Sequence, residues 1–245
     1  MESKLSELKQ KIDKEKKKQY IRQLNEPPHL TLGEEVGNAV THGVGAMLAI
    51  AGMILLLLKS DTGLKVMASC FYGISLVMLM LMSCLYHAFR SGSGVKRLWR
   101  RFDYSSIYLL IGGTFAPLYL VYWGNTLGIV LFCVQWGLII LGITMIGVFG
   151  PGRLQWLHFS LYFVIGWSAL MFIPDWLKND RPLFWFIIIG GIIYTVGGII
   201  YALKLPIFNS HHKNFGSHEI FHLFVMGGSV CHFIVMYFFV MPMPA

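Results

Sequence analysis

The chain has 245 residues, of which 56% are hydrophobic and only 13% are charged, and its formal net charge is +8. A soluble protein of this composition would lack the polar surface needed to cover its apolar residues, so the sequence predicts an integral membrane protein. The four cysteines lie in apolar stretches and have none of the paired spacings of structural zinc or redox motifs. Composition therefore excludes a soluble, disordered, fibrous or disulfide-stapled chain.

Residues 1–30 form a polar, Lys-rich tail with the run KEKKK near its centre. One interpretation is a solvated cytoplasmic tail, since charge runs are commonly no more than that. The other is an amphipathic helix that binds anionic lipid headgroups at the membrane surface. The apolar positions of such a helix would be Leu5, Leu8, Ile12, Tyr20, Ile21 and Leu24. Nucleic-acid binding is not expected.

Residues 31–245 form the membrane domain, because this region contains seven apolar runs of about 20 residues, the length that spans a hydrocarbon core. The expected spans are 36–58, 66–88, 104–122, 127–149, 155–173, 183–203 and 219–241. Strict alternation of apolar and polar residues, which marks membrane β-barrels, is absent, so the spans should be helices. The glycine pairs Gly190-Gly191 and Gly197-Gly198 predict close helix packing in the sixth span. The predicted fold is an all-α bundle of seven transmembrane helices.

Lysine and arginine indicate how this bundle is oriented in a cell membrane. Sixteen of the 20 basic residues fall in the N-terminal tail and in every second loop, and only Lys59, Lys65, Lys178 and Arg181 fall on the other side. Loops rich in Lys and Arg stay in the cytoplasm. The sequence therefore predicts a multi-pass protein with a cytoplasmic N-terminus and, after seven spans, a C-terminus outside.

Polar residues inside the spans gather at the predicted cytoplasmic ends of four helices, and intramembrane polar residues mark function by default. Glu35, Asn38 and His42 share one face at the start of the first span, and Ser83 and His87 share one face at the end of the second. Asp103 is expected at the start of the third span. The seventh span begins with Ser217, His218 and His222.

Three histidines at one membrane depth suit a metal site, and zinc is the expected cofactor. His218 and His222 are four residues apart, so their side chains project about 6 Å from each other on one helical face, and His87 adds a third ligand. Water would take the fourth position and become a nucleophile, with Asp103 accepting its proton and Ser83 donating a hydrogen bond. His42 is either a further ligand or, as we favour, a neighbouring histidine hydrogen-bonded within the Glu35–Asn38 cluster. We expect the remaining histidines, His29, His158, His211, His212 and His232, to be structural or exposed.

Four motifs resemble one family. EEVGNAVTHGVG, SCLYHAF, RFDYSSIYLLIGGTFAP and SHEIFHLFV occur in this order across residues 30–245. They are similar to motifs of the bacterial haemolysin III family, which is related to the progestin and adipoQ receptors and more distantly to the alkaline ceramidases. The resemblance implies seven helices and a zinc ion held near the cytoplasmic face by His87, His218 and His222, with Asp103 and Ser83 beside it. Glu35, Asn38 and His42 fit the first-span motif.

Two functions are compatible with this resemblance. The first is a zinc-dependent hydrolase of a lipid amide or ester, in which a membrane lipid is the substrate and the ion polarises its carbonyl. The alternative is a pore-forming, haemolytic protein or a receptor-like sensor, in which zinc only ties the second and seventh helices together. A water ligand would favour the enzyme, whereas a fourth protein ligand would favour a structural site.

Overall fold

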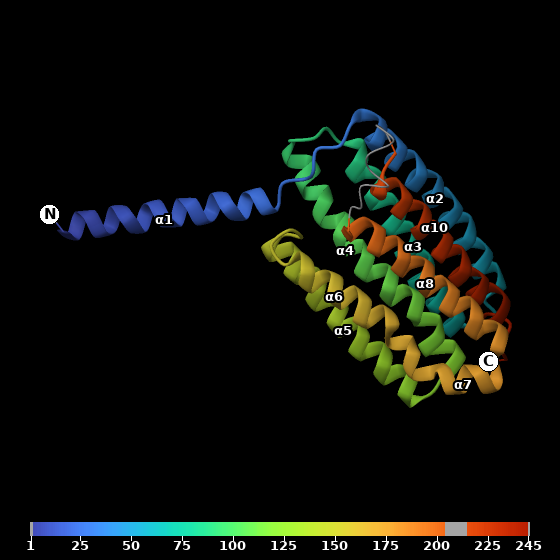
Figure 1. Cartoon of the computed structure of the whole chain (residues 1–245). Coiled ribbons are helices and arrows are strands. Elements are labelled where there is room, and N and C mark those ends of the chain that lie inside the picture. The colour runs from blue at the N-terminus through green and yellow to red at the C-terminus, as the bar shows by residue number, and fades with distance from the viewer. Residues whose placement is uncertain (1, 204–214, 245) are drawn as a thin grey trace.

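The computed structural model describes residues 2–203 and 215–244, and helices make up nearly all of this part of the chain, which contains no strand. Seven of the helices described are long and apolar enough to cross a membrane. The bundle consists of α2 (Leu32–Lys59), α3 (Gly63–Ala88), α4 (Gly94–Pro117) with its π-helical extension Leu118–Trp123, α5 (Thr126–Phe149), α6 (Gln155–Gly166) continued through Trp167–Phe172 into α7 (Ile173–Asn179), α8 (Arg181–Leu203), and α10 (Ser217–Val235) with its extension Met236–Val240. The helices run side by side in one elongated bundle (Figure 1).

The expected seven-helix fold is confirmed, and two of its helices extend well beyond the expected spans. The third span begins at Gly94, ten residues before the expected start at 104, and the fifth continues to Asn179 rather than ending at 173. Apolar run length misses the first turns of α4 because Lys96, Arg97 and Arg100 are charged. These residues are nevertheless helical, since the Ser93 hydroxyl accepts a hydrogen bond from the Lys96 backbone N–H at 3.1 Å and caps the helix.

Helix α2 also begins with a strong N-terminal cap, at the end of the bundle that contains the predicted site. Thr31 and Glu34 form a reciprocal capping box, in which the Glu34 carboxylate accepts from the Thr31 backbone N–H at 2.7 Å and the Thr31 hydroxyl accepts from the Glu34 N–H at 3.3 Å. The Glu34 carboxylate is thus used at the helix end, whereas the neighbouring Glu35 is buried in the bundle.

Helix α4 is the central helix of the bundle. In its apolar window 78% of the residues are buried, against 22% for α5, and it packs on α3 and α5. Helices α2 and α3 pack along their lengths, as do α8 and α10, and α10 also contacts α2. A side chain at Gly113 of α4 would lie 1.8 Å from the Ser75 hydroxyl of α3, so only glycine allows this close approach. The same holds for Gly190 and Gly197 of α8 against α10.

The Lys-rich tail forms helix α1 (Glu2–Leu24), which extends away from the bundle (Figure 1). Its junction with the bundle is fixed by side chains. Asn25 donates to the Phe149 carbonyl and accepts from the Gly152 N–H, both at 3.0 Å, and Glu26 pairs with Arg97 at 3.2 Å. Ile12 and Tyr20 are exposed, whereas the side chains of Leu5 and Leu8 lie outside the described residues. The tail is therefore a helical arm that is held at its base.

Candidate metal centre

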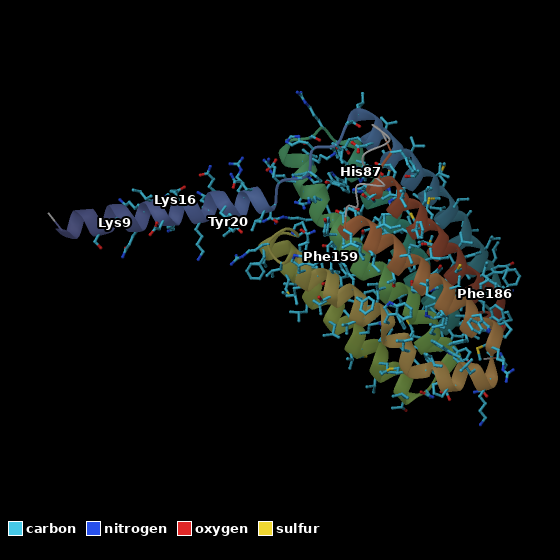
Figure 2. All side chains as sticks on the ribbon, in the orientation of Figure 1. Lys9, Lys16, Tyr20, His87, Phe159 and Phe186 are labelled. Carbon is cyan, nitrogen blue, oxygen red and sulfur yellow. The ribbon has the colours of Figure 1, made fainter. Side chains whose placement is uncertain are left out.

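Three histidines from two helices meet at the end of the bundle from which α1 departs, which we call the histidine end. Figure 2 shows His87 there, whereas Phe186 lies toward the opposite end. His87 is on the last turn of α3, and His218 and His222 are on the first two turns of α10. One ligand nitrogen from each of the three lies within 4.8 Å of the others, so His87, His218 and His222 could hold a metal ion. We call these three residues the metal group. Convergence of these three side chains follows from the close packing of α2, α3 and α10.

His87 has its two ring nitrogens in different environments. Nδ1 lies 2.8 Å from Oε2 of Glu35, and Nε2 lies 3.2 Å from Nε2 of His218. A carboxylate only accepts hydrogen bonds, so the Glu35 contact places the proton of a neutral His87 on Nδ1. The lone pair on Nε2 is then directed at His218 and is available to a metal ion. A carboxylate behind an imidazole is the usual arrangement around histidine ligands.

His222 is oriented in a similar way. Its Nδ1 lies 3.5 Å from the Thr41 hydroxyl, at the long limit of a hydrogen bond, while that hydroxyl lies 2.9 Å from the Gly37 carbonyl and donates to it. The hydroxyl oxygen can therefore accept from Nδ1, which leaves Nε2 as the free lone pair. His42 stacks flat on the His222 ring, with centroids 3.6 Å apart and an interplanar angle of 8°. These contacts hold the ring from one side and from its face.

His42 is a packing histidine beside His222, as we favoured, but its predicted hydrogen bonding within the Glu35–Asn38 cluster was wrong. All three residues are buried, as expected, but Glu35 bonds His87, and Asn38 donates to Glu219 of α10 at 2.6 Å. Neither ring nitrogen of His42 has a hydrogen-bond partner within the described residues. Residues spaced i, i+3, i+7 share a face but lie at different heights along it, so Glu35 reaches α3 while Asn38 and His42 reach two positions on α10. His42 also lies outside the group of three possible ligands.

Ser83, Asp103 and Ser217 all lie near the three histidines. Ser83 is buried one turn before His87, and the Asp103 carboxylate interacts with the Ser83 hydroxyl and lies near His87 and Arg100. We expected Asp103 at the start of the third span, but it lies further along its helix, because α4 begins at Gly94. Ser217 is buried at the first position of α10. The carboxylate and the hydroxyl predicted beside the metal are thus close to the histidines.

Sequence reasoning missed four residues of this site: Thr41, Ser91, Lys96 and Glu219. Lys96 is fully buried and donates to Glu35, and Ser91 donates to the same carboxylate at 3.2 Å. Glu219 is also buried, and it accepts from the Gly216 backbone N–H at 2.7 Å as well as from Asn38. The distribution of Lys and Arg identifies Lys96 only as one of the loop charges that predict topology. The serine pattern SGSGVK, which is typical of a helix N-cap, was the signal that could have placed Lys96 in a helix.

Two further histidines that the structure describes, His158 and His232, lie apart from this group. His158 is buried on α6 and hydrogen-bonds the Tyr108 hydroxyl at 2.9 Å, and His232 is buried with Nε2 at 3.3 Å from the Ile187 carbonyl. His29 is exposed. His211 and His212 fall outside the described residues.

A cavity of about 180 Å³ opens beside the metal group at the histidine end. It is lined by Pro28, His29, Leu30, Glu34, Tyr201, Gly216, Ser217, His218 and Glu219. His218 is the most exposed of the three histidines and lies on its wall. The metal group is therefore accessible to water or to a polar group from this end, while His87 and His222 stay buried.

Comparison with known proteins identifies the family to which this chain belongs. The family model described as haemolysin-III related matches residues 30–233. Hemolysin-3 of Bacillus cereus is 37% identical over 214 residues, covering 85% of this chain and 93% of that protein. The Hemolysin-3 homolog of Bacillus subtilis is 31% identical, covering 87% of this chain and 98% of that protein. The adiponectin receptor protein of Drosophila melanogaster is 26% identical over 219 residues, which cover 81% of this chain and 49% of the receptor. With its seven apolar helices, this chain is a multi-pass membrane protein that belongs to the haemolysin-III-related family.

Proposed function

We propose that the histidine end binds one zinc ion through His87, His218 and His222 and that the protein is a zinc-dependent hydrolase of a lipid amide or ester. The observation that carries the proposal is the 3.2 Å separation of the His87 and His218 Nε2 atoms. Two nitrogens that bind one tetrahedral zinc at about 2.0–2.1 Å are about 3.3–3.4 Å apart. Since the His87 proton is directed to Glu35, the Nε2 lone pair of His87 is free to share a cation with His218.

The donor set supports a catalytic site more than a closed structural one. Three histidines leave a fourth tetrahedral position to water, and a zinc ion so bound supplies Lewis-acid chemistry and lowers the pKa of water to about 7. In this proposal Asp103, whose carboxylate interacts with the Ser83 hydroxyl and lies near His87, would accept a proton. The polar part of a substrate would enter through the cavity beside His218. We further propose that the histidine end faces the cytoplasm, as the distribution of Lys and Arg predicts.

The test is the variant Asp103→Asn in purified, full-length protein. It should retain about one zinc per chain, because the carboxylate is not a ligand in this proposal, yet hydrolyse a ceramide-like lipid about 10²–10⁴-fold more slowly, the usual contribution of a general base. Asp61→Asn is the matched control, since Asp61 is an exposed carboxylate at the opposite end of the bundle. Equal rates in the two variants, or no hydrolysis of any acyl amide or ester by the unmodified protein, would contradict the enzyme.

The second candidate is a pore-forming or receptor-like protein in which zinc is structural. Its support is that relatives carry the names hemolysin and adiponectin receptor, and that the three histidines join α3 to α10. In this case Asp103→Asn would leave dye release from liposomes unchanged. Removing zinc would lower the thermal stability of the bundle, because a metal that binds only the folded state adds to its stability.

For the tail we propose binding to anionic lipid headgroups. Lys9 and Lys16 lie on the exposed helix α1, away from the bundle (Figure 2), and the tail carries eight Lys and Arg residues by position 22. Each basic residue near an anionic surface contributes about 1 kcal/mol of attraction, which salt screens. In nanodiscs that contain phosphatidylserine the tail should resist trypsin better than in phosphatidylcholine alone, and high salt should remove the difference. Equal cleavage in both lipids would contradict lipid binding and support the interpretation of a solvated tail.

A further inference from the structure

A continuous set of buried hydrogen bonds leads from His87 to the first turn of α4. Glu35 uses both carboxylate oxygens: Oε2 lies 2.8 Å from His87 Nδ1, and Oε1 accepts from the Lys96 ammonium and from the Ser91 hydroxyl. The Lys96 ammonium also donates to the Phe89 carbonyl at 3.1 Å. The Lys96 and His87 side chains are fully buried, and 11% of the Glu35 side chain is exposed.

Stability alone is a weak reason for such a pair. Taking a carboxylate and an ammonium out of water costs about as much as their attraction returns, so an apolar pair of similar volume often serves a bundle equally well. What distinguishes this pair is its third member, because the same carboxylate holds a histidine of the metal group. Ser93 caps α4 through the backbone N–H of Lys96, which fixes the point from which the lysine side chain extends.

We infer that Glu35 and Lys96 are positioning residues of the metal site, Glu35 by fixing the tautomer and direction of His87 and Lys96 by fixing Glu35. The inference rests on the proposed zinc site but not on hydrolysis. Carboxylates behind histidine ligands raise ligand basicity and hold the ring, and their loss weakens metal binding about 10–100-fold. Lys96 extends this support to a third helix, so that α2, α3 and α4 jointly orient one imidazole.

The effect of Lys96 has a sign that separates positioning from plain charge. An ammonium near a dication repels it, so its removal would strengthen zinc binding if charge alone mattered. Positioning predicts weaker binding, because the carboxylate loses its strongest donor and no longer holds His87 Nδ1 in one geometry. By charge alone, removing the ammonium would also leave the Glu35 carboxylate unpaired and more attractive to a dication, so the two accounts predict opposite signs.

The experiment measures the zinc dissociation constant of the full-length protein in detergent by competition with a chelator. Glu35→Gln should bind zinc about 10–100-fold more weakly, and Lys96→Met about 10-fold more weakly. Lys65→Met is the matched control: Lys65 is also buried and pairs with a carboxylate and a backbone carbonyl, Asp61 and Met243, but at the opposite end. It should bind zinc as the unmodified protein does. Unchanged or tighter binding by Lys96→Met would overturn the role of Lys96.

The double variant Glu35→Gln with Lys96→Met keeps the test decisive if the Lys96 single variant does not fold, because it removes both charges together. Positioning through Glu35 predicts that the double variant binds zinc no more weakly than Glu35→Gln alone. An additional loss would show that Lys96 acts independently of Glu35 and would overturn the inference. Since the readout is metal affinity, these outcomes hold whether or not the protein hydrolyses lipids, and a failure of the enzyme proposal remains distinguishable.

Discussion

The two ends of the bundle each bury a lysine, but they use it differently. At the opposite end the Lys65 ammonium contacts Asp61 and the Met243 carbonyl, both at 2.7 Å, and Lys59 donates to the Tyr237 carbonyl at 2.8 Å. These lysines satisfy carbonyls at the end of the last helix, where backbone acceptors lack intrahelical partners. At the histidine end Lys96 pairs with a carboxylate that in turn holds an imidazole of the metal group.

This contrast shows that a buried charge in a membrane span does not identify a functional site by itself. In the part of the chain that the structure describes, the Asp61 side chain is 67% exposed and forms an ion pair with Lys65 alone, whereas the Glu35 side chain is 11% exposed and pairs with both His87 and Lys96. What marks the histidine end is the convergence of side chains from α2, α3, α4 and α10 on one small volume.

The largest effect is expected from His87→Ala or His218→Ala. Either change leaves two imidazoles, too few to hold zinc in a three-histidine site, so zinc should fall from about one per chain to a small fraction of that. His158→Ala is the matched control, because His158 is a buried histidine that bonds only Tyr108 in the described structure. Metal analysis after purification checks the result. Full zinc retention in both site variants would remove the distinction between the two ends.

Lys65→Met should have an intermediate effect, on stability and not on metal. It leaves the Met243 carbonyl without its charged donor, and a lost hydrogen bond of this kind costs about 1–3 kcal/mol. We expect a lower melting temperature in detergent and an unchanged zinc content. Zinc loss in this variant would mean that the two ends are coupled through the bundle.

The smallest effect is expected at Asp61, as a shallow dependence of stability on pH. The hydrogen bond from Lys65 lowers the pKa of this exposed carboxyl. A lowered pKa in the folded state means that the stabilisation is present above the ordinary pKa of the group and is lost as the pH falls through the lowered value. Asp61→Asn should therefore flatten the acid limb of the melting-temperature profile slightly. A steeper limb in this variant would contradict the contact.

The sequence was sufficient for the bundle and for the metal group because both depend on strong local signals. Apolar run length determines where a chain can cross a membrane, and the i, i+4 spacing of His218 and His222 fixes their common face. His87 could be added because helix direction alone places it at the same depth. A sequence therefore predicts well those residues of a membrane site that are related by helix direction or by their spacing along one helix.

The contacts around the histidines could not be predicted because they depend on how helices rotate against each other. Glu35, Asn38 and His42 share a face, yet they reach His87, Glu219 and the His222 ring respectively. Hydropathy could not identify Lys96 as a site residue, because it assigns charged residues to loops. In the structure Lys96 lies in the capped first turn of α4 and its side chain is buried. Such pairings require the packed structure.

The most direct measurement is zinc K-edge X-ray absorption on the purified, unmodified protein together with its metal content. The proposed site predicts about one zinc per chain with three imidazole nitrogens at about 2.0–2.1 Å and one oxygen ligand completing a tetrahedron. Protein without zinc after purification in zinc-containing buffer, or zinc bound through sulfur, would contradict the assignment of His87, His218 and His222 as the metal ligands.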